Sequence, residues 1–290
     1  MNTASESMSN APFYLSNARW GVGTGTTQLK DSLTEAQFCS QPQDIYGRFN
    51  MGITAENVAA RLGISRERQD RFALASQQKA AAAIESGRFK DEIVPVFVPQ
   101  GRKKEPVLFE VDEFPRETTL EKLAALKPVF QPEGGTVTAG NSSGRNDGAS
   151  ALLLMSMDKA AVLGQKPIAR ILSTASAGVD PRYMGLGPVP AVRKALKLAG
   201  LTMDDIGLIE LNEAFAAQSL GCIQELGLED RIDRINVNGG AIALGHPIGS
   251  SGSRILVTLL HEMRRRGVRR GLATLCVGGG MGMATVAELL

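Results

Sequence analysis

The sequence lacks the marks of several large protein classes. Its 290 residues include three cysteines, too few for a disulfide framework, and this usage favours a reducing compartment such as the cytoplasm. No apolar run approaches the roughly 18 residues of a transmembrane helix. The N-terminal stretch MNTASESMSNAPF has no basic region followed by an apolar segment, so we expect no secretory signal. The 32 basic and 30 acidic residues nearly cancel, which disfavours nucleic-acid or membrane-surface binding.

Aromatic residues are also few, with 1 Trp, 3 Tyr and 10 Phe, whereas there are 32 glycines. This balance favours tight turns and close backbone approaches over a surface on which bases stack. Apolar residues make up 43% of the chain, as in globular rather than disordered proteins. The length indicates roughly two domains.

Common nucleotide, hydrolase and metal motifs are missing. There is no G-x-x-x-x-G-K-[ST] loop and no G-x-S-x-G elbow. Gly21, Gly23 and Gly25 do not fit the dinucleotide spacing, because Thr26 stands where the third glycine should be. Two histidines and three scattered cysteines give no zinc spacing, so no metal is expected. The basic run Arg264–Arg270 is interpreted as a solvated helix end, with a phosphate contact as the alternative.

The first half of the chain reads as loops and helices. Residues 1–50 appear irregular in pattern, and two helices follow at about 54–62 and 65–86. We expect Thr54 and Ser65 to cap these helices and Gly63 and Gly87 to end them. An edge strand with two prolines is predicted over 91–99, then an exposed charged excursion over 101–119 and a helix that ends before 128.

The second half alternates strands and helices. We expect a core strand near 149–156, a closing pair of strands at 271–280 and 281–289, and a strand with a turn at 234–247. The alternation predicts an α/β layered domain. The first half has too few strands to close such a sheet on its own.

Three polar residues are candidates for chemistry because they are expected just past three strands, where open α/β sheets bind ligands. They are Asn212, His246 and Cys276. His246 precedes Pro247, which favours an extended turn, and a helix opens directly after it. The positive helix end should lower the imidazole pKa and keep a neutral base available; the alternative is a structural histidine that bonds a carbonyl.

Cys276 precedes three glycines, Gly278 to Gly280, which would leave one wall free of side chains and let a ligand approach the sulfur. A slightly perturbed thiol can exchange protons near neutrality; the alternative is a small buried hydrophobe. Asn212 either caps the next helix or presents its amide to an oxyanion or a water. Cys222 is expected to serve packing, and His261 to lie at a helix rim.

Several blocks resemble the signatures of the thiolase family, and together they cover essentially the whole chain. They are NEAFA at 212–216, NVNGGAIALGHPIGSSG at 236–252, LCVGGGMG at 275–282, TVTAGNSSGRNDGA at 136–149, MGITAENVA at 51–59 and SAGVDPRYMGLGPVPA at 176–191. The resemblance implies a thiolase-like layered α-β-α fold whose N-terminal half is incomplete. It implies four segments: the remnant 1–16 of an N-terminal domain, a helical loop domain at 17–131, the end of the N-terminal domain at 132–165, and a C-terminal domain at 166–290.

The resemblance also implies an activity and roles. A thiolase condenses two acetyl-CoA molecules to acetoacetyl-CoA, or cleaves 3-ketoacyl-CoA, through an acyl group carried on a cysteine. His246 would activate that cysteine, Cys276 would move the proton of the α-carbon or incoming thiol, and Asn212 would fix a water in the oxyanion hole. Coenzyme A is a substrate rather than a resident cofactor. Its pantetheine arm would contact Met51, Phe130, Ala139, Ser143, Ala214 and Phe215. Homodimers or homotetramers are implied.

The chain departs from the family pattern at the nucleophile. The family's acyl-carrying cysteine lies upstream of a block like Ser5–Ser9, and Cys39, in the context FCSQP, does not match it. Asn50 and Arg145 also differ from residues common in relatives. Three hypotheses follow: a thiolase whose N-terminal segment is missing here, a non-catalytic CoA-binding or assembly subunit or relic, and a chain in which Cys39 has become the nucleophile. No activating motif accompanies Cys39.

Overall fold

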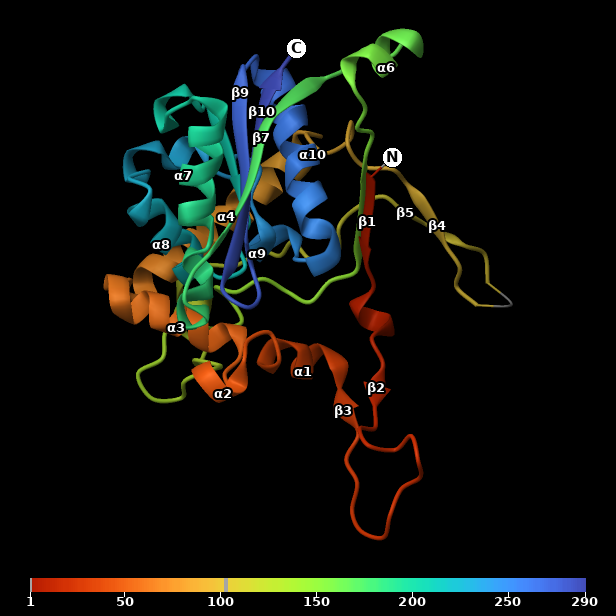
Figure 1. Cartoon of the computed structure of the whole chain (residues 1–290), viewed down its shortest axis with the longest axis vertical. Helices are drawn as coiled ribbons and strands as arrows, with labels where there is room; N and C mark the ends of the chain where they lie inside the picture. The colour runs from red at the N-terminus through yellow and green to blue at the C-terminus, as the bar shows by residue number, and fades with distance from the viewer. Residues whose placement is uncertain (1, 102–103) are drawn as a thin grey trace.

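A four-stranded sheet forms the centre of the computed structural model, which describes residues 2–101 and 104–290. The strand order is β7 (Ala169–Gly178), β10 (Met281–Leu289), β9 (Arg270–Val277) and β8 (Leu208–Leu211). β10 runs antiparallel to both of its neighbours, and β8 runs parallel to β9. The expected closing pair of strands is therefore confirmed, and it occupies the middle of the sheet rather than an edge (Figure 1).

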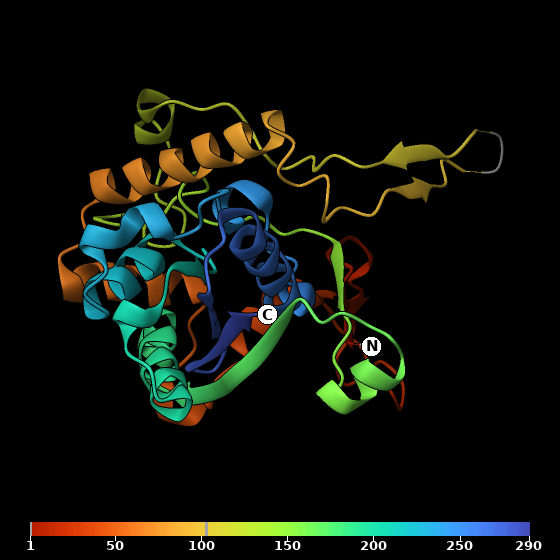
Figure 2. The same ribbon diagram turned by 90° about the horizontal axis from the view of Figure 1, so that it is seen from above.

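Helices cover both faces of this sheet. α7 (Pro188–Ala199) packs on β7 and β10, and α10 (Ile248–Arg266) packs on β9 and β8 (Figure 2). Within α10, Ile255, Leu259 and Met263 recur every four residues and are fully buried, so one stripe faces the sheet. Burying such a side chain stabilises the fold by about 1.5–3 kcal/mol. The expected α/β layers are confirmed in this half of the chain.

A second group of helices packs beside the sheet: α3 (Met51–Leu62), α4 (Arg66–Glu85) and α8 (Ala216–Glu225). Ser65 caps α4 and Gly63 ends α3 in the left-handed region, as predicted. The predicted cap at Thr54 is wrong. α3 begins three residues earlier, where the Asn50 side chain accepts a hydrogen bond from the Ile53 backbone N–H at 3.1 Å. The Thr54 hydroxyl instead donates to the Met51 carbonyl inside the helix.

The first fifty residues hold more regular structure than the sequence indicated. They contain β1 (Asn2–Glu6), the 3-10 helix η1 (Met8–Asn10), β2 (Phe13–Tyr14), β3 (Lys30–Asp31), α1 (Ser32–Phe38) and α2 (Gln43–Tyr46). β1 pairs with β6 (Gly148–Leu152), far along the chain. Such short elements give little local periodicity, and long-range pairing decides them.

The expectation of a core strand at 149–156 is wrong. β6 ends at Leu152 and pairs only with β1 among the described residues. Its residues alternate between half-buried and exposed, because one face packs on α10 and the other is open. The next apolar residues, Leu153 and Leu154, are 63% and 51% exposed.

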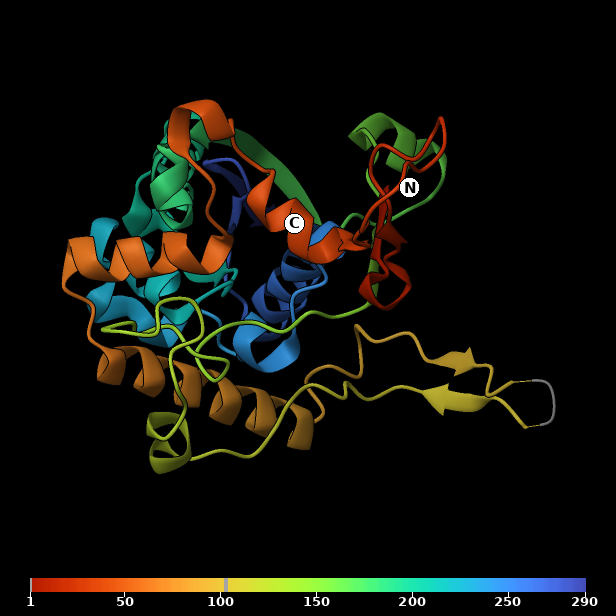
Figure 3. The same cartoon turned by 90° about the horizontal axis from the view of Figure 1, so that it is seen from below.

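A hairpin of β4 (Val96–Val98) and β5 (Val107–Phe109) projects from the body of the molecule (Figure 3). All six strand residues are exposed, so the predicted edge strand and exposed excursion are confirmed, although β5 itself was not foreseen. α5 (Leu120–Ala124) ends before Pro128 as expected. The predicted strand at 234–247 is wrong: this stretch carries a short helix, α9 (Ala241–Leu244).

The remaining elements are α6 (Met157–Val162) and the 3-10 helices η2 (Pro181–Leu186), η3 (Met203–Asp205) and η4 (Glu229–Arg234). Within the described ranges, no helix combines the length and apolar character that crossing a membrane requires.

Candidate active site

Two of the three predicted catalytic residues lie away from the expected strand ends. Only Asn212 directly follows a strand, β8. Cys276 lies within β9, and His246 follows the short helix α9. The fold still brings them to one region. The Asn212 backbone N–H donates to the Thr274 carbonyl at 3.0 Å, two residues before Cys276 on the neighbouring strand. The Asn212 Nδ2 atom lies 3.4 Å from the His246 Nε2 atom.

The hydrogen bonds around His246 fix its tautomer. The Ser251 hydroxyl donates to the Pro247 carbonyl at 2.9 Å, so its oxygen is left to accept from the Nδ1–H of His246 at 2.6 Å. With the proton on Nδ1, the Nε2 lone pair faces Asn212. The backbone N–H of His246 donates to Asn146 Oδ1 at 3.2 Å. The His246 ring is therefore held with Nε2 as its free acceptor atom, and among the described residues neither ring nitrogen bonds a backbone carbonyl, as the structural alternative required.

The pKa of His246 is lowered to about 4, as expected in direction. The cause differs from the one predicted. Burial contributes most, and the positive charge of Arg254 on α10 adds to it. A buried imidazolium loses its hydration without gaining a carboxylate partner, so the neutral ring is favoured. The imidazole therefore remains neutral and able to accept a proton at neutral pH.

Asn212 does not cap the following helix. The N-cap position of α8 is Phe215, and Asn212 lies three residues earlier, almost fully buried. Its Nδ2 faces His246, and its Oδ1 is buried without a hydrogen-bond partner among the described residues. An unsatisfied buried acceptor costs about 1–3 kcal/mol, so this oxygen is suited to accept a hydrogen bond from a water or a ligand.

Cys276 is a protonated thiol in this setting. Burial raises its pKa to about 12, so the earlier premise of a slightly perturbed thiol is wrong. A thiol with such a pKa stays protonated at neutral pH, and its thiolate, once formed, is a strong base. Its apolar neighbours are Met184, Ala214, Met51 and Phe215, which group around the sulfur.

The glycines after Cys276 make room for neighbouring backbone segments rather than for a ligand. A Cβ on Gly279 would lie 2.6 Å from the Ser40 carbonyl oxygen, and a Cβ on Gly280 would lie 2.4 Å from the Val179 carbonyl oxygen. Both glycines have φ +86°. The space that the missing side chains leave is therefore filled by two segments of this same chain, which corrects the prediction of ligand access from that side.

Of the six residues that the resemblance assigns to pantetheine binding, five lie close together. The Phe130 and Phe215 rings meet edge to face with centroids 6.1 Å apart. The Ser143 backbone N–H donates to the Ala214 carbonyl at 3.0 Å. Ala139 is exposed, and its carbonyl accepts from Arg116 Nη2 at 3.2 Å. Met51 packs near Ala214 and Phe215, so five of the six are linked by contacts around the Cys276 side.

Sequence reasoning missed the residues that hold this site in place. Ser251 and Asn146 orient His246, as described above. Glu213 is buried and its carboxylate accepts from Ser76 Oγ at 2.6 Å and Asn236 Nδ2 at 2.7 Å, which ties the segment after β8 to α4. Burial raises the pKa of Glu213. The sequence signal that could have indicated Ser251 is the serine-rich GSSGS segment, which begins a helix just after His246.

The other cysteines lie elsewhere. The Cys222 Sγ–H donates to the Gly185 carbonyl at 3.1 Å in the core, which confirms its packing role. Cys39 is exposed, and Gln43 Nε2 is its hydrogen-bond partner at 3.7 Å. His261 is half-buried on α10, near the predicted rim position.

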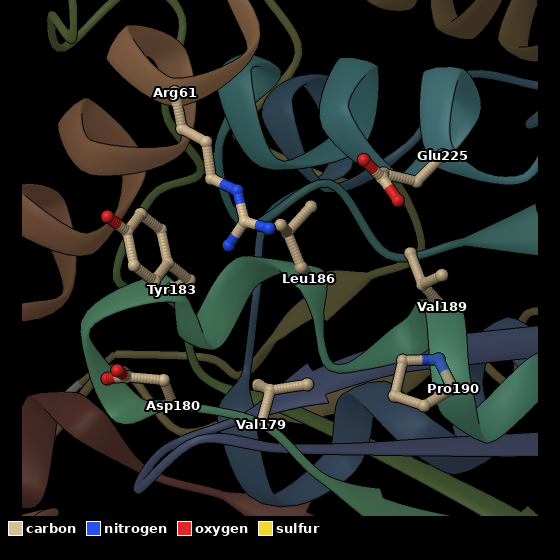
Figure 4. A pocket seen from close by; sticks show the side chains of 8 residues that line it. All are labelled: Arg61, Val179, Asp180, Tyr183, Leu186, Val189, Pro190 and Glu225. Carbon is tan, nitrogen blue, oxygen red and sulfur yellow. The ribbon is translucent and has the colours of Figure 1, made fainter.

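A cavity of about 180 Å³ lies apart from these residues, beside η2. The Arg61 guanidinium stands over the Tyr183 ring at 4.9 Å, and Glu225 points toward the same space (Figure 4). The other lining residues are Val179, Asp180, Leu186, Val189 and Pro190. None of the predicted site residues lines it. In the ranges 2–101 and 104–290, no three His, Cys, Asp or Glu side chains form a group that could hold a metal ion.

Two models of one protein family match this chain, one in each half. The family model described as "Thiolase, N-terminal domain" matches residues 3–158, and "Thiolase, C-terminal domain" matches residues 165–289. An acetyl-CoA acetyltransferase of Syntrophomonas wolfei is 56% identical over 290 residues, which are 100% of this chain and 72% of that protein. An Escherichia coli protein of the same name is 56% identical over 98% of this chain and 71% of its own length.

Solved structures agree with these sequence matches. The Bacillus anthracis acetyl-CoA acetyltransferase superposes with a TM-score of 0.92 at 47% identity, covering 99% of this chain and 70% of its own. Human mitochondrial 3-ketoacyl-CoA thiolase in complex with CoA gives a TM-score of 0.91 at 46% identity, again covering 99% of this chain and 70% of its own. The chain thus spans about 70% of the length of these proteins.

Proposed function

This chain belongs to the thiolase family and has the acyltransferase function of acetyl-CoA acetyltransferases, and from that premise we propose how its residues carry the reaction. One observation carries the proposal. The Pro247–Ser251–His246 hydrogen bonds leave a neutral imidazole whose Nε2 lone pair faces Asn212. A Claisen-type acyl transfer needs such a base.

We assign three roles. His246 Nε2 accepts the proton of the acyl-carrying cysteine that the family motif places upstream of Ser5–Ser9, because the ring is neutral and its other nitrogen is already bonded. Cys276, a buried protonated thiol, gives its proton to the carbanion released when the carbon–carbon bond is cleaved. The resulting Cys276 thiolate then takes the proton of the CoA thiol that attacks the acyl group, which restores Cys276, and condensation runs through the same steps in reverse. Asn212 Oδ1 holds a water whose remaining proton points to the thioester oxygen.

We also propose that coenzyme A binds this chain as a substrate, with its pantetheine arm along Met51, Phe130, Ser143, Ala214 and Phe215, and near Ala139. Arg116 supports this path. Its guanidinium donates to the Ala139 carbonyl and stacks over Phe114 at 5.4 Å, so it offers a cation for a phosphate of the ligand. Assembly as a homodimer or homotetramer and a cytoplasmic location stay predictions.

A second candidate function is binding of acyl-CoA without turnover. The observation in its favour is that Cys276 is the one described cysteine among the site residues, since Cys39 is exposed on another segment and Cys222 bonds Gly185 in the core. The family mechanism uses two cysteines at the site. The third hypothesis, Cys39 as nucleophile, has no base in contact with the sulfur among the described residues.

One pair of assays separates these functions. Thiolysis of acetoacetyl-CoA by CoA is measured for the whole chain and for His246→Ala, Cys276→Ala and Cys39→Ser, and CoA binding is measured by titration calorimetry. Turnover that is lost in the first two variants and kept in Cys39→Ser supports the acyl transfer. Binding without turnover supports the second candidate. Loss of turnover in Cys39→Ser alone would support the third hypothesis, and absence of both binding and turnover would refute the proposal.

A further inference from the structure

Glu213 directly follows Asn212 in the chain, and it is 1% exposed. Its carboxylate accepts three hydrogen bonds from three different segments. The Ser76 hydroxyl on α4 donates to Oε2 at 2.6 Å, the Asn236 Nδ2–H donates to Oε1 at 2.7 Å, and the Ile242 backbone N–H on α9 donates to Oε2 at 3.2 Å. Hydrogen bonds to a carboxylate are among the stronger ones in proteins, so this side chain holds three segments together next to Asn212.

The surroundings of Glu213 match a carboxylate. All three partners are donors, and a carboxylate has acceptor atoms only. Burial raises the pKa of Glu213, whereas its three hydrogen bonds and the charge of Lys79 lower it. Lys79 and Glu213 line the same cavity of about 50 Å³, and the Lys79 ammonium donates to the Ile235 carbonyl at 2.8 Å. This position therefore requires a side chain with two acceptor oxygens.

Asn236 fixes the end of β8 just before Asn212. Its Oδ1 accepts from the Leu211 backbone N–H at 2.8 Å, and its Nδ2 donates to the Leu211 carbonyl at 2.8 Å. The same Nδ2 also donates to Glu213. The backbone of Asn236 has φ +46°, in the left-handed region that residues other than glycine rarely adopt. Asn236 therefore holds the residues on both sides of Asn212 with one side-chain amide.

The hydrogen bond from Ile242 connects this network to His246. Ile242 lies in the four-residue helix α9, which ends two residues before His246. Gly240 precedes that helix, and a Cβ on it would lie 2.2 Å from the Glu213 Cδ atom, so only glycine leaves room for the carboxylate. The Gly240 backbone N–H donates to the Ser76 hydroxyl at 3.0 Å. Glu213 and Ser76 thus hold the start of α9 against α4 and against the segment after β8.

The contact between Asn212 and His246 is too weak to set its own distance. The Asn212 Nδ2 and His246 Nε2 atoms are 3.4 Å apart, which is long for a hydrogen bond, and Asn212 Oδ1 has no partner in the described part of the chain. The separation of the two side chains therefore depends on the backbone that carries each of them. Those backbone segments are 211–213 and 240–246, and Glu213 bridges them.

We propose that Glu213 is a positioning residue for the candidate site: its carboxylate holds the segment of Asn212 against the segment of His246 and thereby sets the separation of these two side chains. This role rests on the proposed function of both residues in acyl transfer. Glu213 itself touches neither the substrate nor the reacting atoms in this assignment.

The test measures the geometry of the site by NMR on the whole chain and requires no turnover. In wild type, the side-chain amide protons of Asn212 should show a nuclear Overhauser contact with the ring protons of His246. Glu213→Gln keeps the shape of the side chain but replaces one acceptor oxygen by an NH₂ group, so a donor then faces a donor. We expect the contact between Asn212 and His246 to be lost or clearly weakened in this variant.

Glu56→Gln is the matched control. Glu56 lies on α3 and is 6% exposed, and its carboxylate accepts from the Thr136 and Val137 backbone N–H groups and from the Thr136 hydroxyl. It is thus a second buried carboxylate with the same kinds of donor, and these donors lie outside the segments that Glu213 bridges. Glu56→Gln should keep the contact between Asn212 and His246.

Two results would overturn the proposal: a contact that persists in a folded Glu213→Gln chain, or a contact that is lost equally in Glu56→Gln. If Glu213→Gln does not fold, Ser76→Ala replaces it. This change removes one of the three donors and the acceptor of the Gly240 N–H, while the carboxylate stays in place. An unchanged contact in folded Ser76→Ala would overturn the proposal in the same way.

Turnover separates this role from the proposed function. In an active chain, Glu213→Gln should lower kcat by roughly 10- to 100-fold and change KM for CoA much less, because a misplacement of about 1 Å can cost about 100-fold in rate. A lost contact with unchanged kcat would also overturn the proposal. An inactive wild-type chain whose contact is lost in Glu213→Gln refutes the acyl-transfer function and keeps the positioning role. An active chain whose contact and kcat are both unchanged in Glu213→Gln does the reverse.

Discussion

Removing the Ser251 hydroxyl should release the tautomer of His246. Ser251 is fully buried, and its oxygen accepts from Nδ1–H at 2.6 Å while its own proton goes to the Pro247 carbonyl at 2.9 Å. Ser251→Ala leaves the Nδ1–H buried without an acceptor, which costs about 1–3 kcal/mol. The alternative neutral tautomer places the proton on Nε2 and avoids this cost.

The size of the effect follows from that cost. A difference of about 1–3 kcal/mol corresponds to roughly 5- to 150-fold in the tautomer ratio or in a rate that depends on it. We therefore expect the Nδ1–H form to lose its dominance, and turnover that uses Nε2 as a base to fall by a comparable factor. In that form the proton on Nε2 would face the Asn212 amide across 3.4 Å, and Asn212 would turn its unpaired Oδ1 to the ring to accept it.

The assay is nitrogen-15 NMR of the imidazole, which distinguishes the protonated from the unprotonated ring nitrogen. Ser253→Ala is the matched control. It removes a hydroxyl two residues along the same helix that bonds Ser150 and the Ser250 carbonyl rather than His246. The reasoning is refuted if the proton of His246 stays on Nδ1 in a folded Ser251→Ala chain, or if Ser253→Ala changes the tautomer equally.

Three further outcomes are expected. The folded-state pKa of Glu210 lies above its unfolded value, so its contribution to stability is present at low pH and is lost as pH rises from about 4.5 through about 8. Glu210→Gln should therefore become more stable relative to wild type as pH rises, by up to a few kcal/mol. Urea unfolding at several pH values measures the difference, and a difference that does not change with pH would contradict the expectation. Gly279→Ala should cost well over 1 kcal/mol because of its positive φ and its backbone neighbour, whereas Gly278→Ala, whose Cβ would meet a side-chain carbon at 3.3 Å, should cost clearly less in the same unfolding assay. The exposed Leu153 and Leu154 beside the open face of the β1–β6 pair should make the chain self-associate, and a sharp melting transition independent of protein concentration would contradict that.

Local signals were enough for many helix ends and for the family. Ser65 and Gly63 mark helix ends because capping depends on residues within one turn. The apolar stripe of α10 is written in every fourth residue from Ile255 to Met263. The motifs around Asn212, His246 and Cys276 indicated the thiolase family, whose models match both halves of the chain.

Other features had no local signal. β1 and β6 depend on each other across about half of the chain. Asn50 rather than Thr54 caps α3, and because both residue types suit a cap, the local pattern did not decide between them. The stretch at 234–247 alternates like a strand, yet it folds into α9, where Glu213 accepts a hydrogen bond from the Ile242 backbone N–H.

The sequence by itself determined which residue types stand at the site, because side-chain chemistry belongs to each residue wherever it lies. The tertiary structure decided their protonation and access. Burial lowered the pKa of His246 to about 4 and raised that of Cys276 to about 12, and the segment around Ser40 filled the space beside Gly279. These properties depend on solvent exclusion and on neighbours distant in sequence, and both exist only once the chain has folded.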